Sequence, residues 1–139
     1  MLAKVRLRSW QRNSTPLSWQ IAAPDYCPWV LGRALRGLAN GPSPQWLQDR
    51  LTAIGLRPIN RLVDVTNFFT FDLGRPLHVF DTKKVQGSVL TMAPGDGEQK
   101  LLALNGKEYV PGPEDCVIAD AAGPEGLAGI VGGEHSGCD

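Results

Sequence analysis

The chain has 139 residues, of which 42% are hydrophobic and 20% charged, and its 14 basic side chains balance 14 acidic ones. This size and composition predict one globular domain and exclude an intrinsically disordered chain. No apolar run approaches the roughly 20 residues that cross a membrane, and the first residues do not form a secretory signal.

The neutral total conceals an uneven distribution of charge. Residues 1–75 carry a formal charge of +6 and residues 76–139 a charge of −6. A basic half attracts polyanions through its local field even when the whole molecule is neutral. Two solvated faces that attract each other in the fold would give the same pattern, so both interpretations stay open.

The three cysteines, Cys27, Cys116 and Cys138, are widely spaced and form no CxxC motif. Reduced thiols in a cytoplasmic protein fit this spacing best. A zinc site would need four ligands at close spacing, and only His78 and His135 could supplement the cysteines. We therefore expect a cytoplasmic protein with no bound metal and with neither a membrane nor DNA as a partner.

The N-terminal part of the chain has weak periodicity. We interpret residues 1–23 as a poorly determined leader with room for one edge strand, and residues 24–139 as the domain itself. Residues 28–38 alternate apolar side chains with arginines and contain two glycines that disfavour a helix, so they predict a strand.

Two helices are predicted next. Residues 44–54 form the first, with Ser43 as its cap, Pro44 at its first position and Gly55 as its left-handed end. Residues 61–73 form the second, between the cap Asn60 and the stop Gly74. The two expected buried stripes are Leu47, Leu51 and Ile54 in the first helix, and Leu62, Val65, Phe69 and Leu73 in the second.

The remainder predicts β-structure. Residues 77–80 alternate as a strand, with Leu77 and Val79 on one face and His78 and Phe80 on the other. Asn105-Gly106 predicts a hairpin turn, and a loop at Gly123-Pro124 separates the last two strands. The further expected strands are 88–93, 100–104, 107–110, 116–119 and 127–131. The fold class is thus α+β, with both helices packed on a largely antiparallel sheet.

Two side chains are candidates for chemistry. His78 could orient water near neutral pH, or it could be a strand histidine satisfied by a backbone carbonyl. Glu134 follows two glycines that allow close approach of a ligand hydroxyl, or it is a solvated loop acid. Glu134-His135-Ser136 is not a hydrolytic triad, because adjacent side chains point to different sides.

The glycine and arginine patterns are less specific. Gly132-Gly133 lacks the spacing of a nucleotide-phosphate loop. Arg57, Arg61 and Arg75 surround the second helix and could contact RNA phosphates, or they could form a solvated face. Trp46 is interpreted as packing against the first helix's buried stripe.

Five separated motifs occur in the order of one family. They are GPSPQWLQDRLTAIGLRPIN, LVDVTNFFTFDLGRPLHVFD, LALNGKEY, CVIAD and LAGIVGGEHSG. From about residue 25 to 139 the chain resembles the bacterial phenylalanyl-tRNA synthetase β subunit, in the B3 part of its B3/B4 module. The resemblance implies a C-terminally truncated piece of a longer chain, with a layered α+β fold.

The resemblance also implies an editing site that hydrolyses mischarged tyrosyl-tRNA(Phe). In it Glu134 would accept the tyrosine hydroxyl, His78 and Asn67 would position the ester and its attacking water, and Arg57 would hold the terminal adenosine or organise the pocket. These four side chains would line one concavity. The implied partners are tRNA(Phe) and the α subunit, whose synthetic site, and not this chain, would hold ATP and magnesium.

Two alternatives remain at this point. The chain could be a non-catalytic module that binds RNA or another subunit. It could also be a free-standing hydrolase of misacylated tRNA, although the family continues beyond GGEHSG into strands that complete the pocket. By the resemblance, ester hydrolysis is the only enzymatic activity that this region would carry.

Overall fold

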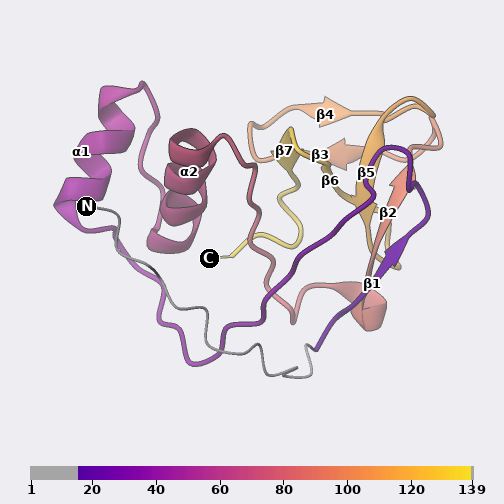
Figure 1. Ribbon diagram of the computed structural model, residues 1–139, viewed down its shortest axis with the longest axis horizontal. Helices are drawn as coiled ribbons and strands as arrows, with labels where there is room; N and C mark the ends of the chain where they lie inside the picture. The colour runs from indigo at the N-terminus through magenta and orange to yellow at the C-terminus, as the bar shows by residue number, and fades with distance from the viewer. Residues whose placement is uncertain (1–15, 139) are drawn as a thin grey trace.

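The computed structural model describes residues 16–138 and has two helices beside two β-sheets (Figure 1). The helices are α1 (Gln45–Ala53) and α2 (Arg61–Leu73), and a 3-10 turn, η1, spans Gln86–Ser88. The strands are β1 (Ser18–Ile21), β2 (Val89–Pro94), β3 (Leu101–Leu102), β4 (Glu108–Tyr109), β5 (Cys116–Ala119), β6 (Pro124–Leu127) and β7 (Val131–Gly132). The predicted α+β class is confirmed.

The larger sheet has the strand order β1-β2-β5-β6-β7, and β3 and β4 form a separate antiparallel pair. All pairs in the larger sheet are antiparallel except β1 and β2, which run parallel with Ser18 opposite Val89. An isolated bridge between Ala103 and Gly133 joins the two sheets. The edge strand that we expected within residues 1–23 is β1, whereas residues 1–15 lie outside the described part.

The core of the sheet lies on one face of β2. Leu90 is fully buried, and Met92, two positions further, is also buried, while Thr91 between them is half-buried, as strand alternation requires. Leu90 packs in a cluster with Leu17 and Val85. The partly buried side chains against this cluster are Trp19, Phe80 and Ile118.

Several predicted β features are confirmed. Strands β2 and β5 match residues 88–93 and 116–119 within one residue. The hairpin between β3 and β4 turns at Asn105-Gly106, where Gly106 has a φ of +74° and donates its N–H to Ala103 O at 2.8 Å. Both hairpin strands are shorter than predicted.

Helix α1 ends as predicted, but it begins differently. Gly55 has a φ of +84°, and the N–H groups of Gly55 and Leu56 donate to Thr52 O and Leu51 O, which is a Schellman end. Ser43 does not cap the helix, because its hydroxyl instead donates to the Asp64 carboxylate. Leu47 and Leu51 are buried, but the prediction for Ile54 is wrong, because it lies past the last turn and is exposed.

Helix α2 has the predicted bounds but not the predicted buried face. The Asn60 side chain accepts the Val63 N–H at 3.0 Å, and Gly74 ends the helix in the left-handed conformation. The stripe is wrong at Val65, Phe69 and Leu73, which are exposed. The only buried side chain of α2 is Asp64. The closest packing of each helix is with the other helix.

Three predicted strands are wrong. Residues 28–38 are irregular and unpaired, with Leu31 92% exposed, and residues 77–80 also form no strand. Residues 127–131 contain a tight turn, with Gly129 at a φ of +73°, that connects β6 to β7. At residues 28–38 and 77–80, alternation does not reveal whether a second strand lies beside the segment. At residues 127–131, the apolar run continues through a turn.

Candidate functional site

The end of β7 positions both chemical candidates. Gly132 lies against the imidazole of His78, and a Cβ atom at position 132 would collide with that ring. Gly133 follows, and its N–H donates to Glu125 O at 2.7 Å. Glu134 comes next, and its N–H donates to Leu102 O at 3.0 Å. The two glycines thus let His78 and strand β6 approach the backbone directly before Glu134.

His78 is half-buried and its ring packs edge-on against Phe80, with ring centroids 4.4 Å apart. Burial holds the pKa of His78 below its ordinary value, so the neutral imidazole is favoured at neutral pH. Its Nε2 atom is buried and has no hydrogen-bond partner within residues 16–138. The alternative interpretation was a strand histidine bonded to a backbone carbonyl. The structure shows no such bond at Nε2.

Glu134 is exposed and lines an open cavity of about 670 Å³. The cavity lies between the β3 segment, the loop before β6 and the turn after β7. Its lining residues are Gln99–Leu102, Ala122–Glu125 and Gly133–His135. Of the four side chains expected to share one concavity, Glu134 is the only one in this lining, as far as the described chain extends.

The remaining predicted residues belong to the helical part of the molecule. Asn67 lies half-buried in the middle of α2, and Arg57 is exposed in the connection between α1 and α2. Arg75 is exposed just after α2. Arg61 donates from its guanidinium to Ala39 O and Pro42 O, each at 3.3 Å, and so holds the preceding segment against α2. The structure brings His78 against Gly132, two residues before Glu134, but it places the other candidates on separate elements.

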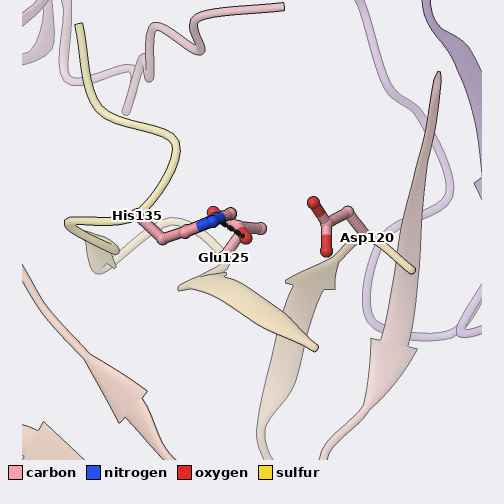
Figure 2. Close-up of side chains that lie close together, drawn as sticks. All are labelled: Asp120, Glu125 and His135. Carbon is pink, nitrogen blue, oxygen red and sulfur yellow. Dashed lines mark hydrogen bonds and ion pairs between the residues drawn. The ribbon is translucent and has the colours of Figure 1, made fainter. Parts of the chain in front are cut away.

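Sequence reasoning missed a second group on the same cavity. Glu125 in β6 is buried, and its Oε1 lies 2.7 Å from Nδ1 of His135 (Figure 2). Asp120 lies close by, so that one possible ligand atom from each of the three side chains lies within 4.8 Å of the other two. Sequence reasoning could not find this group, because Glu125 falls between the predicted loop at Gly123-Pro124 and the predicted strand 127–131, and only the structure shows that it is buried.

No helix within residues 16–138 is both long and apolar enough to span a membrane.

Comparison with known proteins places this architecture in a family. Residues 26–139 match the B3/4 domain, and the chain belongs to that family. The chain is also similar to three proteins named phenylalanine–tRNA ligase beta subunit. That of Mesorhizobium japonicum is 56% identical over 128 residues, covering 92% of this chain and 16% of the relative.

The same subunit of Gluconobacter oxydans is 52% identical over 125 residues, covering 90% of this chain and 15% of the relative. That of Paramagnetospirillum magneticum is 62% identical over 112 residues, covering 81% of this chain and 14% of the relative. The resemblance predicted from the five motifs is confirmed. The chain spans only 14–16% of the length of these relatives.

Proposed function

We propose that this chain is part of the β chain of a phenylalanine–tRNA ligase and contributes to hydrolysis of mischarged tyrosyl-tRNA(Phe). The observation that carries the proposal is the placement of His78. Its ring lies against Gly132, two residues before Glu134, and its buried Nε2 has no partner among the described residues. This nitrogen has an unused hydrogen-bonding position, and the proposal requires the surrounding residues to open at the ring so that a ligand or a water molecule can reach it.

Glu134 would recognise the amino acid. An exposed carboxylate at the mouth of a cavity can accept a hydrogen bond from the phenolic hydroxyl of tyrosine. Phenylalanine has no hydroxyl and would leave that acceptor without its partner. A site built around one hydrogen bond discriminates strongly against the analogue that lacks the group.

His78 would act on the ester bond. Because burial favours its neutral form, the imidazole can accept a proton from an attacking water or hold that water in place. Asn67 would help to orient the ester from α2. No serine or cysteine nucleophile is needed, since a positioned water and stabilisation of the developing oxyanion are sufficient for ester hydrolysis.

The rest of the proposal concerns partners. The exposed Arg57 and Arg75 would contact the phosphates of tRNA(Phe), and Arg57 would reach the terminal adenosine. Arg61 would add charge while holding residues 39–42. In the whole enzyme an α subunit would provide the aminoacylation site with its ATP and magnesium. We propose the cytoplasm as the location.

One observation favours a second candidate function, a non-catalytic module that binds RNA or another subunit. Five of the exposed apolar side chains lie along α2 and just after it, namely Val65, Phe69, Phe71, Leu73 and Leu77. Apolar surface of this kind is typical of an interaction face. Binding of tRNA(Phe) without deacylation above background would select this function.

A deacylation assay tests the main proposal. The 139-residue protein is incubated with tyrosyl-tRNA(Phe), and tyrosine release is compared between the wild type and His78→Ala. We expect the variant to lose at least about 100-fold in rate, as removal of an acid–base group does. Glu114→Ala, a change at an exposed acid away from the cavity, is the matched control and should keep the wild-type rate. Equal rates for wild type and His78→Ala would contradict the proposal.

A further inference from the structure

We propose that Asp120, Glu125 and His135 bind one divalent transition-metal ion, such as Zn²⁺. One ligand atom from each residue lies within 4.8 Å of those of the other two. Asp120 follows β5, Glu125 lies in β6 and His135 follows β7, so the hairpin of β6 and β7 assembles the group. Figure 2 shows the carboxylate of Asp120 directed toward the other two side chains.

Glu125 distinguishes this group from an ordinary acidic cluster on a surface. The residue is 2% exposed, yet it carries an ionisable carboxyl group. Its Oε1 is paired with Nδ1 of His135 at 2.7 Å, but its Oε2 is buried and has no hydrogen-bond partner in the described chain. An unpaired buried carboxylate oxygen is costly in free energy, and a bound cation would satisfy it.

Asp120 is held in place for the same task. Its Oδ2 accepts the Gln86 N–H and its Oδ1 accepts the Ala122 N–H, both at 2.7 Å. Each carboxylate oxygen keeps a second lone pair, so these bonds orient the group without preventing coordination. Two carboxylates this close together repel each other when both are ionised, and a divalent ion removes that repulsion.

The donor set indicates the kind of ion. One imidazole nitrogen and two carboxylates suit zinc and its neighbours, whereas calcium and magnesium prefer oxygen donors alone. Tetrahedral bonds of about 2.1 Å would place the ligand atoms about 3.4 Å apart. On binding, the more widely spaced atoms must therefore approach, and Oε1 of Glu125 and Nδ1 of His135, now 2.7 Å apart, must separate. His135, whose side chain is 53% exposed, lies in a turn that can make this adjustment. Three protein ligands leave a fourth position for water, open to the cavity.

Nuclear magnetic resonance of the two histidines tests the site directly. The sequence contains only His78 and His135, so both rings can be followed while Zn²⁺ is added to the wild-type protein. We expect one equivalent to shift the ring nitrogen signals of His135 and to leave those of His78 unchanged. An unchanged His135 at millimolar zinc would overturn the proposal.

Calorimetry with a matched pair of variants gives a second readout. Glu125→Gln should weaken zinc binding at least tenfold, and Glu114→Gln should not change it. If Glu125→Gln fails to fold, His135→Asn, at an exposed position, replaces it. Co²⁺ should bind without a thiolate-to-metal absorption band. A thiolate-to-metal band would assign the metal to the cysteines and refute this site. Wild-type zinc affinity in whichever of Glu125→Gln and His135→Asn folds would also refute it, because the ion would then bind elsewhere.

Discussion

The sheet region (the seven strands) and the helical region (residues 28–73) are stabilised in different ways. In the sheet region Leu90 is fully buried and anchors a cluster of apolar side chains. In the helical region the buried side chains are Leu47 and Leu51 together with the hydrogen-bonded pair Ser43 and Asp64. The sheet region therefore has its own hydrophobic core, whereas the helical region depends on caps, polar pairs and one small helix contact.

The largest expected effect is the difference in stability loss between truncating a buried leucine of the sheet region and truncating a partly exposed phenylalanine of the helical region. Leu90→Ala should lower the free energy of unfolding by about 2–5 kcal/mol, because it removes a fully buried side chain. Phe69→Ala should change it by less than about 1 kcal/mol, because Phe69 is 41% exposed. Urea unfolding measures both values. Equal losses of unfolding free energy in the two variants would show that the helical region has a hydrophobic core of its own.

The polar pair of the helical region comes next. Ser43→Ala removes the hydroxyl that donates to the buried Asp64 carboxylate, and the Ile59 N–H at 2.8 Å remains as a donor. We expect a loss of about 1–3 kcal/mol by urea unfolding. Thr52→Ala, an exposed position on α1, is the control and should stay within about 0.5 kcal/mol. An unchanged unfolding free energy for Ser43→Ala would mean that the Ser43–Asp64 pair does not stabilise the packing of the two helices.

The contact between His78 and Gly132 joins the segment after α2 to the sheet region. Gly132→Ala should cost about 1–3 kcal/mol in unfolding free energy, because the new methyl group meets the imidazole ring. The same change in a His78→Ala background should cost much less, since the ring is gone. Additive effects in this double-mutant cycle would contradict the contact.

The smallest effect concerns pH and the same histidine. Because burial lowers the pKa of folded His78 below its ordinary value of 6.5, the unfolded chain binds a proton there first as pH falls. Stability from neutral His78 is therefore complete above pH 6.5 and declines below it, down to the folded pKa. Urea midpoints measured from about pH 8 to about pH 5 should fall more steeply in the wild type than in His78→Gln. Parallel curves would mean that the ring is not buried.

Local structure could be predicted from the sequence better than the elements that pack or pair with each other. The bounds of α2 and the turn at Gly106 follow from caps and glycines, which act within a few residues. The parallel pairing of β1 with β2 joins residues about 70 positions apart, and nothing in either strand specifies it. An apolar stripe such as Val65 and Phe69 shows which side of α2 is hydrophobic, but not whether another element covers it.

The candidate site divides in the same way. His78 and Glu134 could be selected from their motifs, because the residues around them resemble a family. The group of Asp120, Glu125 and His135 could not, since it exists only when the hairpin of β6 and β7 closes. Spacing along the chain predicted no metal, whereas the fold brings three possible ligands together from residues 120–135.

The ratio of tyrosine to phenylalanine release tests the central claim most directly. Initial rates of deacylation are measured for tyrosyl-tRNA(Phe) and phenylalanyl-tRNA(Phe), with the wild type and with Glu134→Ala. The proposed recognition of the hydroxyl predicts a strong preference for the tyrosyl ester in the wild type and a ratio at least about tenfold lower in the variant. An unchanged ratio, with deacylation retained, would show that Glu134 does not recognise the tyrosine hydroxyl.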